Sequence, residues 1–358
     1  MTRLRIAVVG AGHLGRIHTR LLANFDNVEL AGIVDPVAKQ RDSIAEEFQV
    51  APFEHHQELA GQVDAAVVAA TTDQHYALAR DFLLQGVHVL IEKPITAHVE
   101  QADELISLAH ANNLVLQVGH VERFNPAWTA VASHVRRPRY IEAVRASGYT
   151  FRSTDIGVVL DLMIHDLDLA LSIVRSRLID VDATGATVLG PHEDMAHAHL
   201  RFANGCVVNL NASRTSFQAQ RTIQVITDRS YVGVDFAAAD AKVIRPEAEL
   251  LRGRVNVHEF SSEEKDRLRE TLFTDLLPLE SVRVEPGNAI QDEQQDFIDC
   301  ILTGRQPQVS GEQARYCLAV ADQIHASIAD KQRRARHASD PGTSLPFPTR
   351  FQRARKAG

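Results

Sequence analysis

The stretch Gly10-Ala11-Gly12-His13-Leu14-Gly15 decides the fold that this sequence predicts. It ends a short apolar run, Leu4–Gly10, typical of a buried parallel strand, and a helical stretch begins directly after it at Arg16. In the pattern G-x-G-x-x-G, the first glycine permits a tight turn, the second leaves room for a pyrophosphate, and the third lets the helix approach the strand. Free N–H groups at the helix start would bind that pyrophosphate. We therefore expect a dinucleotide site that includes Gly10, Gly12, His13, Leu14 and Gly15.

A second apolar run, Val28–Val34, ends in Asp35, twenty residues after Gly15. An acid at this position accepts a hydrogen bond from a ribose 2′-hydroxyl and repels a 2′-phosphate. Asp35 therefore predicts NAD as the cofactor in preference to NADP. Lys39 and Arg41 lie near Asp35 in the sequence, so NADP stays open as an alternative cofactor.

Composition excludes several classes of protein. The 358 residues suffice for two domains, and 45% hydrophobic with 23% charged residues is typical of a globular protein. A formal net charge of −8 argues against general nucleic-acid binding. The three cysteines form no C-x-x-C pair, which favours a reducing compartment. The first strand lies close to Met1 and no run reaches membrane-span length, so we expect no signal peptide, no membrane contact and a cytoplasmic location.

Strand-like and helix-like runs alternate as far as Gly119, which predicts an α/β fold with a doubly wound parallel sheet, a Rossmann domain, over residues 1–122. Ligands of such sheets bind at the carboxyl ends of the strands. We therefore expect one shared rim made of Gly10–Gly15, Asp35, Ala70–Asp73, Glu92–Pro94 and Gly119–Asn125.

Residues 123–330 predict a second α/β domain with a mostly antiparallel open sheet. Its strand-like runs include Met195–Phe202 and Cys206–Ala212, joined by an Asn-Gly hairpin turn at Asn204. A sheet face rich in Val, Ile and Leu would need a cover, so we expect a homodimer or homotetramer. The basic segment 331–358 predicts a solvated tail or an arm on a neighbouring subunit.

Lys93 follows a central strand within Glu92-Lys93-Pro94. An ammonium group at the rim would reach toward a bound nicotinamide and stabilise a substrate oxygen as its proton leaves. The alternative is a solvated lysine at a strand end.

A predicted helix over Val158–Val174 carries Asp161, His165 and Asp168 on one face at helical spacing. A histidine beside an aspartate is suited to act as a general base near neutral pH. The alternative is a structural histidine on an amphipathic helix.

Further polar residues lie at the expected rim. Thr71, Thr72, His75, Glu92 and Arg123 are candidate cofactor contacts, although His75 could serve only to start a helix and Arg123, with Asn125, could lock the domain junction. His197 and His199 face one way on a strand without an evident third ligand, so we expect no metal.

Taken together, these motifs resemble the Gfo/Idh/MocA oxidoreductase family over roughly Leu4 to Ala329. The resemblance implies a Rossmann domain followed by an α/β domain, with Lys93 and His165 acting on the substrate and Asp161 as the supporting acid. The stretch Ala70–His75 lacks the family's usual proline and asparagine. Gly119–Pro126 is similar to the version in nucleotide-sugar 3-dehydrogenases, which oxidise the 3-hydroxyl of UDP-N-acetylglucosamine. Candidate ligands for the substrate's diphosphate are Arg145, Arg152 and Arg214.

Three functions remain in competition. The first is NAD-dependent oxidation of a secondary hydroxyl of a UDP-sugar, the second is an inositol or free-sugar dehydrogenase, and the third is a non-catalytic NAD-binding sensor. A sensor would need neither Lys93 nor His165.

Overall fold

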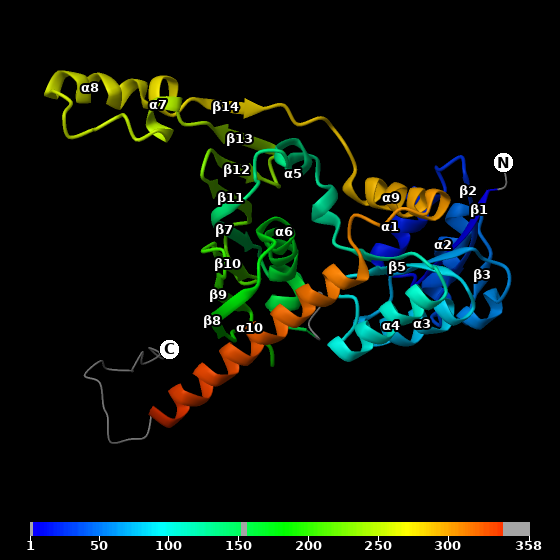
Figure 1. The fold of residues 1–358 in the computed structure, drawn as a ribbon. Helices are drawn as coiled ribbons and strands as arrows, with labels where there is room; N and C mark the ends of the chain where they lie inside the picture. Colours follow the sequence, from blue (N-terminus) through cyan, green and yellow to red (C-terminus); the bar gives the residue numbers. More distant parts are fainter. Residues whose placement is uncertain (1–2, 152–155, 339–358) are drawn as a thin grey trace, which may run out of the picture.

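The computed structural model describes residues 3–151 and 156–338 and contains two sheets side by side (Figure 1). The first sheet is parallel, in the order β3-β2-β1-β4-β5-β6. Its strands are β1 (Leu4–Val9), β2 (Val28–Val34), β3 (Pro52–Phe53), β4 (Ala65–Val68), β5 (His88–Glu92) and β6 (Leu116–Gly119), and its helices α1 (His13–Leu22), α2 (Ala38–Phe48), α3 (Thr72–Leu84) and α4 (Val99–Ala111).

Burial explains why this sheet is parallel. All four residues of β4 have no exposed surface, and the apolar cores on the two sides of the sheet take side chains from alternate positions of β1 and β4. Strands covered on both faces read as continuous apolar runs, as the sequence does here. The predicted Rossmann architecture is confirmed.

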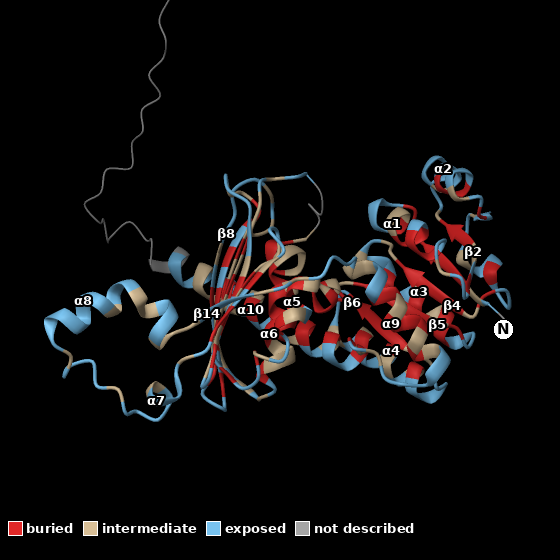
Figure 2. Ribbon diagram, turned by 90° about the horizontal axis from the view of Figure 1, so that it is seen from above, coloured by how far each residue is buried: buried red, intermediate tan, exposed pale blue. Residues whose placement is uncertain are grey.

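The second sheet has the order β14-β13-β12-β11-β7-β10-β9-β8, and every neighbouring pair except β7–β10 is antiparallel. This confirms the predicted mostly antiparallel sheet. Its strands are β7 (Pro138–Ala146), β8 (Leu178–Ala186), β9 (Met195–Phe202), β10 (Val207–Ser213), β11 (Gln220–Thr227), β12 (Tyr231–Asp235), β13 (Asp240–Ile244) and β14 (Leu279–Val282). Helices α5 (Pro126–Val131), α6 (Ile164–Val174) and α10 (Gly311–Ala338) cover one face (Figure 2).

The other face of this sheet differs from our expectation. Val208 and Leu210 of β10, and Ile223 and Val225 of β11, are all buried on the helix-covered side. The uncovered side carries polar cross-strand pairs instead, such as His199 with Asn209 at 2.7 Å and His197 with Asn211 at 2.9 Å. The expectation of an apolar open face rich in Val, Ile and Leu is wrong, because alternation along each strand sends those residues to the helices.

Two helices near the end of the chain depart from the sequence-based boundaries. α9 (Ala289–Thr303) follows the second sheet in the sequence, yet Phe297 and Ile298 join the apolar core of the first sheet. α10 runs past residue 330, where we expected the basic tail to begin, and ends at Ala338. Residues 339–358, most of the predicted basic tail, lie outside the described residues.

An arm over residues 245–278 was not predicted. It holds α7 (Ala248–Leu251), α8 (Ser262–Thr271) and a π-helical turn, η4 (Leu272–Leu276), and none of the three contains a buried residue. Figure 2 shows the arm extending from the sheet on the side opposite the helices. Among the described residues, no helix combines the length and the apolar character needed to cross a membrane.

Candidate active site

A groove of about 560 Å³ lies at the carboxyl ends of the strands of the first sheet. The glycine turn forms one wall: Gly10 has φ +104°, and a Cβ on it would lie 2.5 Å from the Ala69 carbonyl oxygen. A Cβ on Gly15 would collide with the Gly10 carbonyl oxygen. Gly12, by contrast, has nothing within 4 Å of its missing Cβ, which leaves open space at the start of α1. This turn fits a bound pyrophosphate.

Asp35 lies in the same groove with its carboxylate fixed by the backbone. Its two oxygens accept hydrogen bonds from the Ala11 N–H and the Val37 N–H, each at 2.7 Å. The remaining lone pairs are available to ribose hydroxyls. His55 and His56 also line the groove, although no motif in the sequence marks them.

We expect Asp35→Ser to weaken NAD binding about tenfold or more and to narrow the preference over NADP, because it removes a charged acceptor and the repulsion of a 2′-phosphate. Titration of both cofactors by fluorescence measures this. Asp42→Asn is the matched control, since Asp42 is an exposed acid of α2 that pairs with Arg41. A native protein that prefers NADP would contradict this role of Asp35.

Lys93 lies where β5 ends and reaches across to the helix that follows the second domain's first strand. Its Nζ donates a hydrogen bond to the Asp161 carbonyl oxygen at 2.7 Å and lies 3.9 Å from Asp161 Oδ1. The Lys93 side chain is only 15% exposed, and burial lowers its pKa despite the opposing charge of Asp161. Asp161 belongs to a π-helical turn, η3 (Val159–Met163), a feature often found at functional sites.

His165 stands one turn further, near the start of α6, and is half-buried. Its pKa lies well below 6.5, first because burial disfavours the imidazolium and then because Lys93 and Arg145 are positively charged. Its buried Nδ1 has no hydrogen-bond partner among the described residues. The structure thus pairs Asp161 with Lys93, and the ring of His165 is held neutral at neutral pH.

Asp168, three residues beyond His165 in α6, is engaged by an arginine of the domain junction. Both of its oxygens accept hydrogen bonds from Arg123, at 2.5 and 2.9 Å, in a buried ion pair. Arg123 belongs to η2 (Val121–Phe124), at the junction of the two sheets. This geometry favours the junction role of Arg123 over contact with a cofactor.

The other candidate cofactor contacts divide between the groove and the interior. Thr71 lines the groove, whereas Thr72 opens α3 beside it. His75 is buried, and its ring nitrogens lie 2.8 Å from the Pro94 carbonyl oxygen and 3.0 Å from that of Ala70. Glu92 points inward to His18, at 2.8 Å. His13 and Leu14 are exposed in the first turn of α1.

The arginines suggested for a diphosphate are already engaged. Arg145 pairs with Glu122 and Asp166, and Arg214 pairs with Asp194, all in buried positions. Arg152 lies outside the described residues. The sequence analysis missed Arg221, which faces Arg145 across β7 and β11, is exposed, and forms no ion pair with another described residue. Its positive charge also acts on His165.

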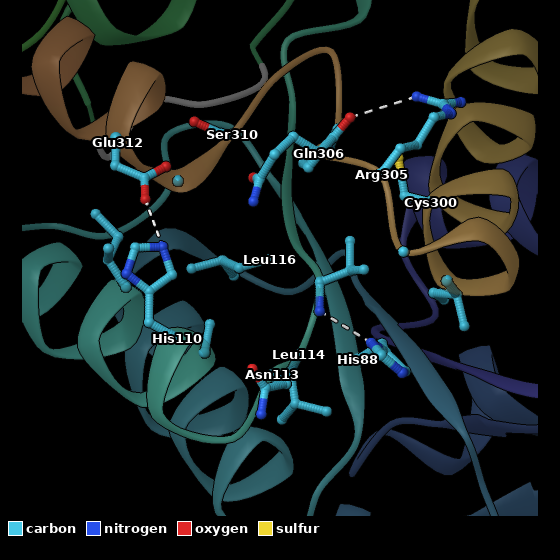
Figure 3. Close-up of a pocket in the computed structure, with 17 residues that line it drawn as sticks. His88, His110, Asn113, Leu114, Leu116, Cys300, Arg305, Gln306, Ser310 and Glu312 are labelled. Atoms are coloured by element: carbon cyan, nitrogen blue, oxygen red, sulfur yellow. Dashed lines mark hydrogen bonds and ion pairs between the residues drawn. The ribbon is translucent and has the colours of Figure 1, made fainter.

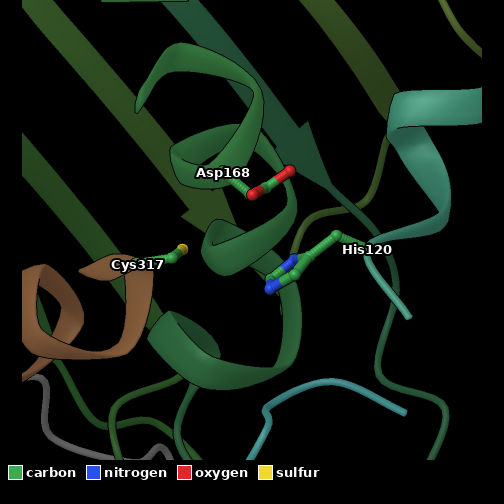
Figure 4. Close-up of side chains that lie close together, drawn as sticks. All are labelled: His120, Asp168 and Cys317. Carbon is green, nitrogen blue, oxygen red and sulfur yellow. The ribbon is translucent and has the colours of Figure 1, made fainter. Parts of the chain in front are cut away.

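Two further features lie outside the candidate active site. His120, Asp168 and Cys317 gather in the interior (Figure 4), but both Asp168 oxygens are bound by Arg123, and we assign no metal there. A second cavity, of about 370 Å³, opens at the amino ends of β5 and β6 between His88, His110 and Arg305 (Figure 3). This cavity and the cofactor groove therefore lie at opposite ends of the strands.

Comparison with known proteins agrees with this geometry. The family model described as the oxidoreductase family with an NAD-binding Rossmann fold matches residues 4–120, and the model of the GFO/IDH/MocA C-terminal domain matches residues 127–232. The chain belongs to the Gfo/Idh/MocA oxidoreductase family. As a member of this family, it is an NAD-binding oxidoreductase, as predicted.

Among members of the Gfo/Idh/MocA family, the UDP-N-acetylglucosamine 3-dehydrogenase of Acidithiobacillus ferrooxidans is 33% identical over 92% of this chain and 98% of its own length. A solved structure of that enzyme, GnnA, superposes with a TM-score of 0.80 over 92% of this chain and 98% of its own. The inositol 2-dehydrogenase of Rhizobium meliloti is 24% identical over 92% of this chain and 98% of its own length.

Proposed function

We propose that this chain oxidises the 3-hydroxyl of UDP-N-acetylglucosamine with NAD. The observation that carries the proposal is Lys93, which reaches from the cofactor rim to Asp161, one turn from a neutral His165. Similarity to a UDP-N-acetylglucosamine 3-dehydrogenase over nearly the whole chain supports the choice of substrate.

In this proposal each residue has a defined task. His165 accepts the proton of the substrate hydroxyl, for which a neutral imidazole is required. Lys93 donates a hydrogen bond to the same oxygen and stabilises its developing negative charge. Asp161 orients Lys93 through its carbonyl oxygen and its carboxylate. NAD, when bound along the Gly10–Gly15 turn and Asp35, supplies the hydride acceptor.

Arg221 is our candidate for the substrate's diphosphate. It is exposed and free of ion pairs with described residues, and its charge acts on the same histidine that the sugar would contact. Phosphate binding by a guanidinium group is bidentate and needs such an uncommitted arginine. Arg145 and Arg214 lack that freedom because carboxylates already hold them.

A substrate panel tests the proposal. Purified protein with NAD is mixed with UDP-N-acetylglucosamine or with myo-inositol, and NADH fluorescence is followed. We expect turnover with the nucleotide sugar alone. Turnover with myo-inositol would favour the second candidate function, and NAD binding without turnover on either compound would favour a sensor.

We also expect self-association into a homodimer or homotetramer. The arm over residues 245–278 extends past the uncovered sheet face and exposes Leu251 and Phe273, at 48% and 51%. An arm with no buried residue and exposed apolar side chains would gain stability by packing on a second copy of the chain. Light scattering at micromolar concentration measures this, and a monomer of 39.6 kDa alone would contradict it.

A further inference from the structure

A group of buried polar side chains lies behind Lys93, between the first sheet and α9. Glu293 of α9 has no exposed surface, and neither of its carboxylate oxygens has a hydrogen-bond partner among the described residues. Atoms of His18, Glu92 and Glu293 all lie within 4.8 Å of one another. A charged carboxylate in such a place is costly unless a proton or a cation neutralises it.

Glu92 is the charged member of this group. It accepts hydrogen bonds from His18 Nε2 at 2.8 Å and from the Lys93 N–H at 3.2 Å. Burial opposes its ionisation, but the hydrogen bond from His18 and the positive charge of Lys93 outweigh it, and the pKa of Glu92 falls. Since Glu92 holds the backbone of Lys93, its position bears directly on the catalytic ammonium group.

His18 has no lone pair left for a metal ion. Gln294 Nε2 donates to His18 Nδ1 at 2.9 Å, which makes Nδ1 an acceptor and places the ring hydrogen on Nε2, facing Glu92. Without His18, two carboxylates remain as ligands, and the described residues provide no third one in the group identified here. The geometry therefore favours a proton over a cation.

We propose that Glu293 is an uncharged carboxylic acid at neutral pH and stands against the Glu92 carboxylate, so that the pair carries one negative charge. Glu293 is then a positioning residue: it keeps Glu92 on His18 and on the Lys93 backbone without adding a second buried charge. The other charged group that acts on Glu293 is Asp296 of α9, which is itself paired with Arg305.

Electrostatics is consistent with this division of charge. Burial, and then the negative charges of Glu92 and Asp296, raise the pKa of Glu293 well above 4.5, while that of Glu92 is lowered. Two neighbouring acids with pKa values pushed apart are typical of a pair that holds one proton. Because the folded state binds this proton more tightly than the unfolded state, its stabilising effect is lost as pH rises from the ordinary glutamic acid range toward the raised value.

Glu293→Gln tests this directly, because glutamine imitates the uncharged acid. From about pH 5 to neutral pH, where the proposal has the folded protein keep a proton that the unfolded chain has lost, we expect the folded-to-unfolded ratio of the native protein to fall about tenfold per pH unit relative to Glu293→Gln. Denaturant unfolding at several pH values measures it. Asp292→Asn replaces the carboxyl of an exposed neighbour on α9 by an amide in the same way and should leave the pH dependence unchanged.

Turnover provides the second readout, and this part rests on the proposed role of Lys93. Glu293→Leu should lower kcat about 10- to 100-fold through a displaced Lys93, with NAD affinity kept, and Glu293→Gln should restore kcat to within about threefold. A Glu293→Gln protein as impaired as Glu293→Leu, or one equivalent of metal in the native protein that Glu293→Gln loses, would overturn the proposal. The unfolding measurements need no substrate, so they test the protonation of Glu293 even if the proposed substrate is wrong.

Discussion

We expect replacement of His165 with alanine to lower kcat about 10²- to 10⁴-fold, the usual contribution of a positioned base, and to leave NAD affinity near the native value. The imidazole lies one turn beyond Asp161, the residue that Lys93 contacts, and away from the glycine turn and Asp35, which form the cofactor groove. Lys93→Met should lose turnover to a similar extent, because it removes the ammonium group that stabilises the negative charge developing on the substrate oxygen. Stopped-flow turnover and NAD titration, measured side by side, test both.

His199→Ala is the matched control, because this histidine lies on the uncovered sheet face and bonds Asn209. It should keep native turnover. Near-native turnover of His165→Ala on the correct sugar would remove His165 from the base role. His120 would then be the next candidate, since both of its buried ring nitrogens lack partners among the described residues.

The pH profile of kcat/KM should lose activity at acid pH only below about 6.5, the ordinary histidine value. Burial, with the charges of Lys93 and Arg145, lowers the pKa of His165, so the base stays unprotonated to lower pH. In Lys93→Met one of these charges is gone. The acid limb of its residual activity should therefore move to higher pH, and an unchanged limb would contradict the electrostatic link between the two residues.

Arg145→Met is the change with the largest expected effect on stability. The guanidinium group lies between Asp166, at 2.7 Å, and Glu122, at 2.8 Å, and all three side chains are buried. Its removal leaves two carboxylates without their shared partner inside the protein. We expect the free energy of unfolding to fall by about 3–5 kcal/mol, the usual result of breaking a buried pair.

Arg139 provides a control on the same strand. It pairs with Asp228 at the surface, where both side chains are more than half exposed. Arg139→Met should leave the unfolding midpoint in urea nearly unchanged, because water and salt screen such pairs. Equal midpoints for Arg145→Met and Arg139→Met would show that the buried network contributes no more than a surface pair.

The sequence by itself determined the features that depend on neighbouring residues. The strand–turn–helix at Gly10–Gly15 is specified by its own glycines, because a Cβ on Gly10 would clash with the Ala69 carbonyl oxygen and a Cβ on Gly15 with that of Gly10. Asp35 and Lys93 end strands of a parallel sheet, so their shared rim follows from the order of apolar runs. The alternation in Val208-Asn209-Leu210-Asn211 already indicates that one face of β10 is apolar and the other polar. It does not indicate which of the two faces the helices cover.

Only the tertiary structure decided which ion-pair partner each buried charged side chain has. Asp168 bonds Arg123 from 45 residues away, and Arg145 joins Asp166 across the helix-covered face. Glu293 reaches Glu92 because α9 crosses back onto the first sheet. Helical spacing alone predicts that Asp161, His165 and Asp168 lie within reach of one another. A buried charge, however, must pair with an opposite charge, and the packing of distant elements decides which opposite charge lies close to it.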